Sequence, residues 1–158
     1  MSGCDYLSIT IHPATVDDLE TLYEIEKECF AAEAFTKEQL GYLLQNPNAM
    51  SLVAQMDGEN AGFVIGLTYN KNKVRIGHIY TIDVAVKHRR RGIGLRLLQE
   101  LEKTFVEEGV ETCYLEVRID NAAARQLYRK QGYMETERLE GYYPMGIHGI
   151  RLKKKLRV

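Results

Sequence analysis

The 158-residue sequence lacks the features that mark an unusual class of protein, and it is poor in cysteine. There are only three, Cys4, Cys29 and Cys113, and no two of them have C-x-x-C spacing. Three cysteines cannot all pair within one chain, so no disulfide framework is indicated. The sequence therefore predicts free thiols in a reducing, cytoplasmic setting. Cys113 lies in an apolar run, which favours a small core residue over a nucleophile.

Long hydrophobic runs and an imbalance of charge are also lacking. No apolar stretch approaches the length that crosses a bilayer, and the N-terminus has no hydrophobic signal core. The formal net charge is −1, with 45% hydrophobic and 27% charged residues, which is ordinary for a globular protein and gives no general attraction to nucleic acid. No repeat or linker-like tract interrupts the chain. We therefore expect one soluble domain over residues 1–158, without membrane contact or specific nucleic-acid binding.

Apolar periodicity predicts a chain that alternates between strands and helices. Leu7, Ile9 and Ile11 alternate with polar residues, as in a strand, whereas Thr15 and Thr36 each offer a capping oxygen before helically spaced apolar residues. The predicted order is β-α-α-β-β-β-α-β-α-β-β, typical of a mixed α/β sheet flanked by helices. The strands cover about residues 7–11, 51–56, 61–69, 74–84, 111–117, 133–138 and 146–154, with hairpin loops at 57–60 and 70–73, and the helices cover about 15–29, 36–44, 92–108 and 121–131.

The most informative stretch is residues 82–95, where a β-branched strand passes through a basic loop into two glycines and an amphipathic helix. The start of a helix carries unpaired backbone N–H groups and a partial positive charge. Gly92 and Gly94 let the backbone approach a ligand without a Cβ in the way, and the arginines at 89–91 add cationic donors. This combination predicts a site for a pyrophosphate or several phosphates. The glycines alone would equally suit a basic turn before a surface helix.

Two common nucleotide-binding motifs are excluded at this loop. It has no Gly-Lys-Ser/Thr, which a nucleotide P-loop requires. It also lacks a third glycine at the spacing used by dinucleotide-binding folds.

The pattern Arg89-x-x-Gly92-x-Gly94 resembles the Arg/Gln-x-x-Gly-x-Gly/Ala signature of the GNAT acetyltransferase superfamily. Further segments are similar to protein N-terminal acetyltransferases, both the bacterial ribosomal-protein alanine type and the archaeal and eukaryotic arrest-defective type: HIYTIDV at 78–84, YLEVR at 114–118, NAAA at 121–124, LY at 127–128, GY at 132–133 and GYY at 141–143. The resemblance spans nearly the whole chain. It implies an α/β (α+β) GNAT fold, with a mixed central sheet of about six to seven strands, splayed at strands 4 and 5 and flanked by about four helices.

The resemblance also implies that acetyl-coenzyme A is the co-substrate and that no metal is needed. In the family, the strand backbone at Ile82, Asp83 and Val84 pairs with the pantetheine arm. The pyrophosphate-binding positions are Arg89, Arg90, Arg91, Gly92, Ile93, Gly94 and Leu95, and those beside the thioester are Asn121, Ala123 and Tyr128. The sequence departs from relatives at Val86, where proline is frequent, and at Asp83, where alanine is common; neither change removes a backbone donor.

The chemistry of amine acetylation asks for a proton acceptor and a proton donor. An amine attacks a thioester only when neutral, and an α-amino group has a pKa near 8, so a base must take a proton at neutral pH. Glu116 stands at the family's base position, and the resemblance implies that it accepts this proton through water. Tyr128 stands at the position of the acid that protonates the departing thiolate. His78 would join Glu116 in a proton relay.

Each of these three residues also has a plainer interpretation. Glu116 could be a solvated carboxylate beside Arg118, Tyr128 could be a core residue, and His78 could be a structural histidine of the strand. The sequence does not decide between these alternatives.

The resemblance places the peptide substrate between two loops. Tyr142 and Tyr143 resemble a tyrosine pair that grips the first residues of a peptide. The opposite wall is the loop at 30–35, where the predicted substrate-binding residues are Phe30 and Glu33. Relatives of the bacterial type have Pro-Trp-Ser near 34–36 and this chain does not, which leaves the substrate less defined than the cofactor. Glu33 could attract a cationic amine, although we expect it to face water, and small residues at 31, 32 and 34 would leave a roomy pocket.

The remaining charge clusters have ordinary interpretations. Glu20, Glu24, Glu26 and Glu28 are expected to form a solvated helix face. The lysines at 153–155 are expected to end an edge strand, where they discourage aggregation, with contact to the ribosome or another polyanion as the alternative.

Together these observations predict an Nα-acetyltransferase that acts on protein N-termini by direct transfer in a ternary complex. Acetylation of a small amine or a lysine side chain, and a non-catalytic module that only binds acetyl-coenzyme A, are the alternatives. Glu116 and Tyr128 argue against the module, because only catalysis asks for both.

Overall fold

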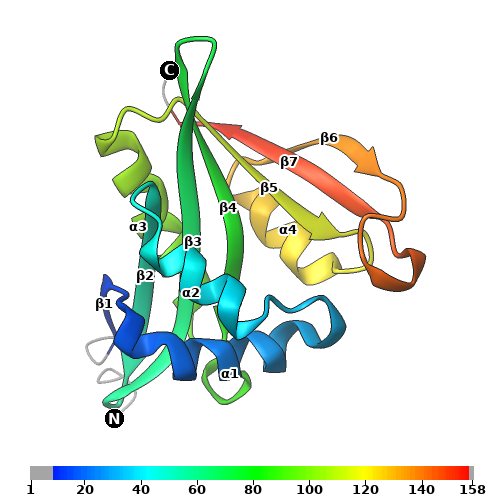
Figure 1. Ribbon diagram of the computed structural model, residues 1–158. Coiled ribbons are helices and arrows are strands. Elements are labelled where there is room, and N and C mark those ends of the chain that lie inside the picture. The colour runs from blue at the N-terminus through cyan, green and yellow to red at the C-terminus, as the bar shows by residue number, and fades with distance from the viewer. Residues whose placement is uncertain (1–8, 157–158) are drawn as a thin grey trace.

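The computed structural model describes residues 9–156, which form one seven-stranded mixed sheet flanked by helices (Figure 1). Leu7, which was assigned to the first strand, and Cys4 lie outside the described residues. The order of elements confirms the predicted order. The strands are β1 (Thr10–Pro13), β2 (Ala49–Met56), β3 (Glu59–Lys71), β4 (Val74–Val84), β5 (Thr112–Arg118), β6 (Met134–Leu139) and β7 (Gly149–Lys155), and the helices are α1 (Leu19–Phe30), α2 (Lys37–Gln45), α3 (Ile93–Glu107) and α4 (Ala122–Lys130).

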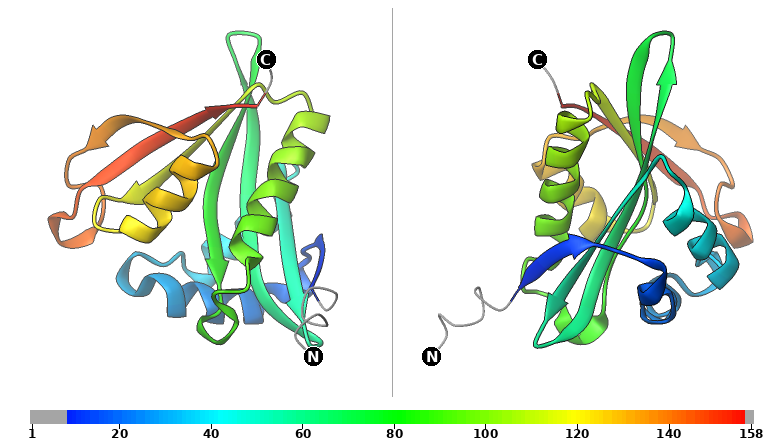
Figure 2. Two further views of the ribbon diagram at one scale, coloured as in Figure 1. Left: turned by 180° about the vertical axis from the view of Figure 1, so that it is seen from behind. Right: turned by 60° about the vertical axis from the view of Figure 1, so that its left-hand side comes forward.

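Helices cover both faces of the sheet, with α1 and α2 on one side and α3 and α4 on the other (Figure 2). The larger core lies under α3, where Leu98, Leu101 and Phe105 are fully buried against β2–β5. A second core joins Leu22 of α1 and Leu40 of α2 to the opposite face. Burial on this scale supplies the main favourable free energy of folding. The sheet is thus fixed from both sides and provides a rigid support for the loops at its ends.

Local sequence signals explain how several elements begin and turn. The Thr36 hydroxyl accepts from the Gln39 amide in a capping box, which confirms the predicted start of α2. Thr15 caps a short 3₁₀ turn rather than α1 itself, so the α-helix begins later than expected, at Leu19. The hairpin turns are also tighter than predicted. Their two central residues, 57–58 and 72–73, all have positive φ, as in type I′ turns.

The sheet opens between β4 and β5, which are neighbouring parallel strands. β4 pairs with β5 only from Ile76 to Ile79, opposite Thr112 to Leu115. Beyond these four pairs the two strands diverge, as Figure 1 shows. The predicted splay between the fourth and fifth strands is confirmed, and it leaves the edge of β4 from Tyr80 onward and the edge of β5 from Glu116 onward without strand partners on the facing side.

A β-bulge marks the point where β4 leaves β5. Tyr80 is an extra residue opposite the step between Ile65 and Gly66 of β3. A bulge shifts the alternation of side chains by one. As a result Ile82 packs against the α3 core, whereas Thr81 turns toward α1 and is buried there.

The position of the lysine cluster differs from the prediction. The strand order β1-β2-β3-β4-β5-β7-β6 places β7 inside the sheet, between β5 and β6, and β6 at the edge. Lys154 is partly buried and forms an ion pair with Glu102 of α3, with Nζ 2.9 Å from Oε1. The expectation of an edge strand for 153–155 is therefore wrong. In the described part of the chain, no helix is long and apolar enough to cross a membrane.

Close packing of α3 against β4 predicts a steric test of the fold. A Cβ added to Gly77 would lie 2.6 Å from Cε2 and 2.8 Å from Cδ2 of the buried Phe105 ring. We expect Gly77→Ala to lower the free energy of unfolding by about 1–3 kcal/mol, because the ring has no room to move. Urea unfolding measures the change. As a control, Gly41→Ala in α2 meets only Leu19 Cδ2 at 3.4 Å and should be neutral or stabilising by up to about 1 kcal/mol. Equal stability of Gly77→Ala and wild type would contradict the packing.

Candidate active site

A pocket of about 520 Å³ lies where β4 and β5 part. Its walls come from β4, β5, the start and middle of α4, the end of α1 with the loop that follows, and the loop between β6 and β7. The pocket is lined by many of the predicted site residues, namely Phe30, Glu33, His78, Ile82, Glu116, Asn121, Tyr128, Tyr142 and Tyr143. The predicted catalytic and substrate-binding residues are therefore brought together.

His78 and Glu116 form a direct contact across the opening between the strands. His78 Nε2 lies 2.6 Å from Glu116 Oε1, and Arg151 Nε of β7 donates to Glu116 Oε2 at 3.0 Å. The Glu116 side chain is only 9% exposed. Burial on its own would raise the pKa of Glu116, but the hydrogen bonds and charges of His78 and Arg151 outweigh burial and hold the pKa below its ordinary value. Glu116 is thus a carboxylate at neutral pH.

Arg118 does not pair with Glu116, so the interpretation of Glu116 as a solvated partner of Arg118 is wrong. Arg118 Nη1 instead donates to Glu33 Oε2 at 2.8 Å, and its other nitrogens bind Asp120. The Glu33 side chain is 12% exposed, so the expectation that it faces water is wrong as well. This ion pair ties the loop after α1 to β5 across the pocket.

Tyr128 projects from α4 into the pocket. Its ring packs edge to face against Tyr133 at a centroid distance of 5.7 Å. Its hydroxyl has no hydrogen-bond partner within residues 9–156 and is not sealed from the pocket. Burial, and then the nearby Asp83, raise the pKa of Tyr128 well above its ordinary value. A tyrosine in this state keeps its proton at neutral pH and can donate it.

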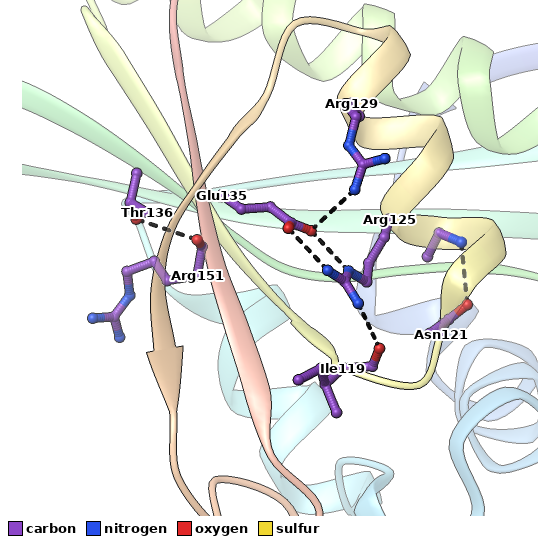
Figure 3. A network of polar contacts seen from close by, with 8 residues as sticks. Ile119, Asn121, Arg125, Arg129, Glu135, Thr136 and Arg151 are labelled. Atoms are coloured by element: carbon purple, nitrogen blue, oxygen red, sulfur yellow. Dashed lines mark hydrogen bonds and ion pairs between the residues drawn. The ribbon is translucent and has the colours of Figure 1, made fainter.

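A polar network fixes the helix that carries Tyr128 (Figure 3). Arg125 forms two hydrogen bonds with the Glu135 carboxylate of β6, at 2.7 and 2.9 Å, and a third with the Ile119 carbonyl at 2.8 Å. Asn121 caps α4 by accepting from the Ala124 amide at 3.1 Å. Bidentate arginine–carboxylate pairs are geometrically specific, so α4 is held in one position relative to β5 and β6.

Two carboxyl groups, Glu26 and Asp83, lie close together on the side of the pocket that faces α1, where Glu26 lines the pocket. Thr81 Oγ1 contacts Glu26 Oε1 at 2.9 Å and Asp83 Oδ1 at 2.5 Å, and the Phe35 amide donates to Glu26 Oε2 at 3.0 Å. Glu26 is 1% exposed, so its assignment to a solvated helix face is wrong. Burial, and then the Glu26 carboxyl, raise the pKa of Asp83. The pair connects α1, β4 and the substrate-side loop. The Asp83 side chain faces α1, so only its backbone would reach a cofactor.

The predicted phosphate site forms a second feature, at the start of α3. Gly92 stands at the N-cap with φ 77°, and no side chain caps the helix. The first helical bond runs from the Arg96 amide to Gly92, so the amides before Arg96 remain available to a ligand. Two of the three arginines are engaged elsewhere. Arg89 Nε donates to the Val84 carbonyl at 3.0 Å, and Arg91 contacts the sulfur of Met56 at 3.3 Å. At this loop, the unpaired backbone amides are therefore more available as donors than Arg89 and Arg91.

The peptide-side residues line the mouth of the pocket. Tyr142 is half exposed and lies edge to face with Tyr143, at a centroid distance of 5.0 Å. The Tyr143 amide donates to the Ile147 carbonyl at 2.9 Å, which closes this loop. Phe30 and Phe35 form part of the opposite wall. An elongated polar molecule could thus enter between aromatic side chains.

Some predicted positions lie outside this pocket, and some lining residues were not predicted. Asp83, Val84, residues 89–95 and Ala123 do not line it. Residues 89–95 form the loop before α3 and the start of that helix, where the Ile93 side chain is buried in the core. The lining residues that were not predicted include Glu26, Phe35, Thr81 and Arg118. Arg151, which was also missed, lies outside the pocket and contacts Glu116. The alternation of side chains along a strand would identify Arg151, which lies directly across from Glu116, but only once β5 and β7 are known to pair.

Comparisons with known proteins agree with this geometry. The model of the acetyltransferase (GNAT) family matches residues 19–133. An uncharacterised N-acetyltransferase of Methanocaldococcus jannaschii is 35% identical over 141 residues, which cover 87% of this chain and 86% of that protein. An N-alpha-acetyltransferase of Sulfurisphaera tokodaii is 37% identical over 112 residues, which cover 65% of this chain and 67% of that protein.

A solved structure shows the same arrangement of elements. The crystal structure of the ribosomal-protein-S18-alanine N-acetyltransferase from Escherichia coli superposes with a TM-score of 0.84 and 26% identity, covering 95% of each chain. The family match spans most of this sequence, and the splayed sheet carries the motif at the start of α3. The chain therefore belongs to the GNAT family of acetyltransferases.

Proposed function

We propose that this protein transfers an acetyl group from acetyl-coenzyme A to the α-amino group of protein N-termini, by direct attack in a ternary complex. One observation carries the proposal: a buried carboxylate–imidazole pair and a protonated phenol line the same pocket, with paired tyrosines at its mouth. Its relatives support the substrate, because proteins of 37% and 26% identity are named as an N-alpha-acetyltransferase and a ribosomal-protein alanine N-acetyltransferase. The whole described chain would act as a single catalytic domain.

The residues of β4 and α3 fit the carrier. Acetyl-coenzyme A supplies an acetyl group activated as a thioester. Uncapped amides from Gly92 to Leu95 would hold its pyrophosphate, since a helix start favours anions. The backbone of Ile82 to Val84 would hold its extended arm, because β4 has no strand partner there on the side of β5. Asn121, Ala123 and Tyr128 would flank its reactive end.

Proton removal falls to His78 and Glu116. A protonated α-amino group entering the pocket must lose a proton before it attacks. His78 uses Nε2 to contact Glu116, and Nδ1 makes no hydrogen bond to the residues described. His78 is also the more exposed member, at 23% against 9%. The imidazole would therefore meet the amine, directly or through water, and the hydrogen-bonded His78–Glu116 pair would act together as the proton acceptor.

Proton donation falls to Tyr128. Burial raises the pKa of Tyr128 and so keeps the phenol protonated at neutral pH, which leaves its O–H available to donate to the sulfur as the thiolate departs. Direct transfer is favoured because neither described cysteine lines the pocket. Burial raises the pKa of Cys113 to about 12 and that of Cys29 to about 11, so both thiols are poor nucleophiles at neutral pH.

A substrate screen tests the proposal. Short peptides that differ in their first two residues are incubated with acetyl-coenzyme A, beside an N-terminally blocked peptide containing lysine and a small polyamine. Mass spectrometry locates the acetyl group. We expect acetylation of free α-amino groups. Acetylation of lysine or polyamine alone would reject the substrate assignment, and binding of acetyl-coenzyme A with no turnover of any amine would reject catalysis.

Replacement of Tyr128 by phenylalanine removes the proton donor and keeps the ring. We expect kcat to fall by about 100-fold, with the Kd for coenzyme A within about twofold of wild type by calorimetry, because no phosphate contact changes. Tyr133→Phe is the matched control, since its hydroxyl bonds Glu102 outside the pocket; its kcat should stay near wild type. An unchanged rate in Tyr128→Phe would remove Tyr128 from the reaction.

Replacement of Glu116 by glutamine predicts a pH-dependent defect. The amine is mostly protonated below its pKa of about 8, so the base matters most there. We expect kcat/KM to drop about 100-fold at pH 7 and the defect to shrink above pH 9, where the free amine predominates. The exposed Glu107→Gln gives the same chemical change away from the site. A small defect that is constant with pH would argue against proton acceptance.

A further inference from the structure

Four charged or titratable side chains form a row across four neighbouring strands. Glu116 of β5 lies directly opposite Arg151 of β7, and Arg151 lies directly opposite Glu137 of β6. His78 of β4 pairs in register with Tyr114, two residues before Glu116 and on the same face. Residues opposite one another on adjacent strands lie close enough to interact. The row therefore leads from the outer edge of the sheet to the pocket.

Each contact along this row is short. Arg151 Nη1 donates to Glu137 Oε1 at 2.9 Å, and Arg151 Nε donates to Glu116 Oε2 at 3.0 Å. Glu116 Oε1 then faces His78 Nε2 at 2.6 Å. Thr136 Oγ1 donates to the Arg151 carbonyl at 3.2 Å, a contact that Figure 3 shows. The backbone and the guanidinium of Arg151 are thus both fixed.

The arrangement leaves Glu116 little freedom. A buried carboxylate is costly unless its oxygens are paired, and here each oxygen has its own partner. Because Arg151 binds one oxygen, the other is turned toward His78. The guanidinium, which cannot lose its proton in proteins, also favours the ionised carboxylate over the protonated form.

We propose that Arg151 is a positioning residue for acetyl transfer, which holds Glu116 ionised and directs its Oε1 at His78. This inference rests on the proposed function, because it concerns the proton acceptor of that reaction. Arg151 does not line the pocket, so it acts through Glu116 and not on the substrate.

An ordinary surface ion pair would not behave in this way. Exposed pairs contribute little to stability or to the ionisation of their members. Glu116, however, is 9% exposed, whereas Glu137, on the far side of Arg151, is 53% exposed. The arginine therefore joins a solvated carboxylate to a buried one. Other titratable or charged groups around Glu116 include Tyr69, Tyr80, Tyr142, Tyr143 and the Arg118–Glu33 pair.

Replacement of Arg151 by glutamine tests the proposal in two independent ways. Titration of the Glu116 carboxyl carbon by NMR should show its midpoint about one pH unit or more higher than in wild type, because an adjacent cation is lost. In turnover of the best peptide, kcat should fall about tenfold, while KM for the peptide and for acetyl-coenzyme A stays within about twofold.

Two further variants separate positioning from charge alone. Arg151→Lys keeps the positive charge without the planar fork, so it should restore most of the Glu116 midpoint and only part of kcat. Lys153→Gln is the matched control. The Lys153 side chain lies two residues from Arg151 on the same strand, is exposed and forms no ion pair in the described structure. Its replacement removes a cation and should change neither quantity. Thermal unfolding confirms that each variant is folded.

The outcomes distinguish this inference from the proposed function. An unmoved Glu116 midpoint with wild-type kcat in Arg151→Gln would overturn the role of Arg151. A fall in peptide or cofactor affinity with unchanged kcat would also overturn it, since that result assigns Arg151 to binding. If wild type acetylates no α-amino group, the proposed function fails, and the NMR titration still reports whether Arg151 controls Glu116.

Discussion

The parting of β4 from β5 is the constraint on which the site depends. Two parallel strands that remained paired would satisfy one another's backbone groups and leave no space between them. Here the pairing stops after Ile79, and the bulge at Tyr80 redirects the strand. The separation is kept open by packing on both sides, because α3 fills one face of β4 and α1 fills the other. The opening between the strands is therefore fixed by the core, and loops complete the walls of the pocket.

Polar groups around this separation are paired with one another between different elements. Arg118 reaches Glu33, Arg151 reaches Glu116, and Glu26 receives the Phe35 amide. Each bond links the sheet or α1 to a wall of the pocket. Because a buried polar group without a partner is costly, these pairs also specify where the walls stand. Stability and the geometry of the site are thus set by the same contacts.

Periodicity and capping rules predicted the elements well, since both depend on neighbours in sequence. The helix start at Thr36 and the two hairpins follow the prediction. The splay of the sheet, which is also observed, was implied by the family resemblance and not by these local rules. Errors arose where the outcome depends on partners far away. Glu26 follows a helical pattern that looks solvated, yet Thr81 buries it. The lysines at 153–155 end an interior strand because β7 inserts between β5 and β6, an order that local sequence does not encode.

The environments of the pocket drive its two key titratable groups toward opposite states. Glu116 is held as a carboxylate by His78 and Arg151, although burial opposes this. Tyr128 is held as a neutral phenol by burial and by the nearby Asp83. A proton acceptor and a proton donor that coexist at neutral pH need this separation of pKa values. Since α4 carries Tyr128 and the sheet carries Glu116, the Arg125–Glu135 clamp between α4 and β6 also sets the distance across which the two groups cooperate.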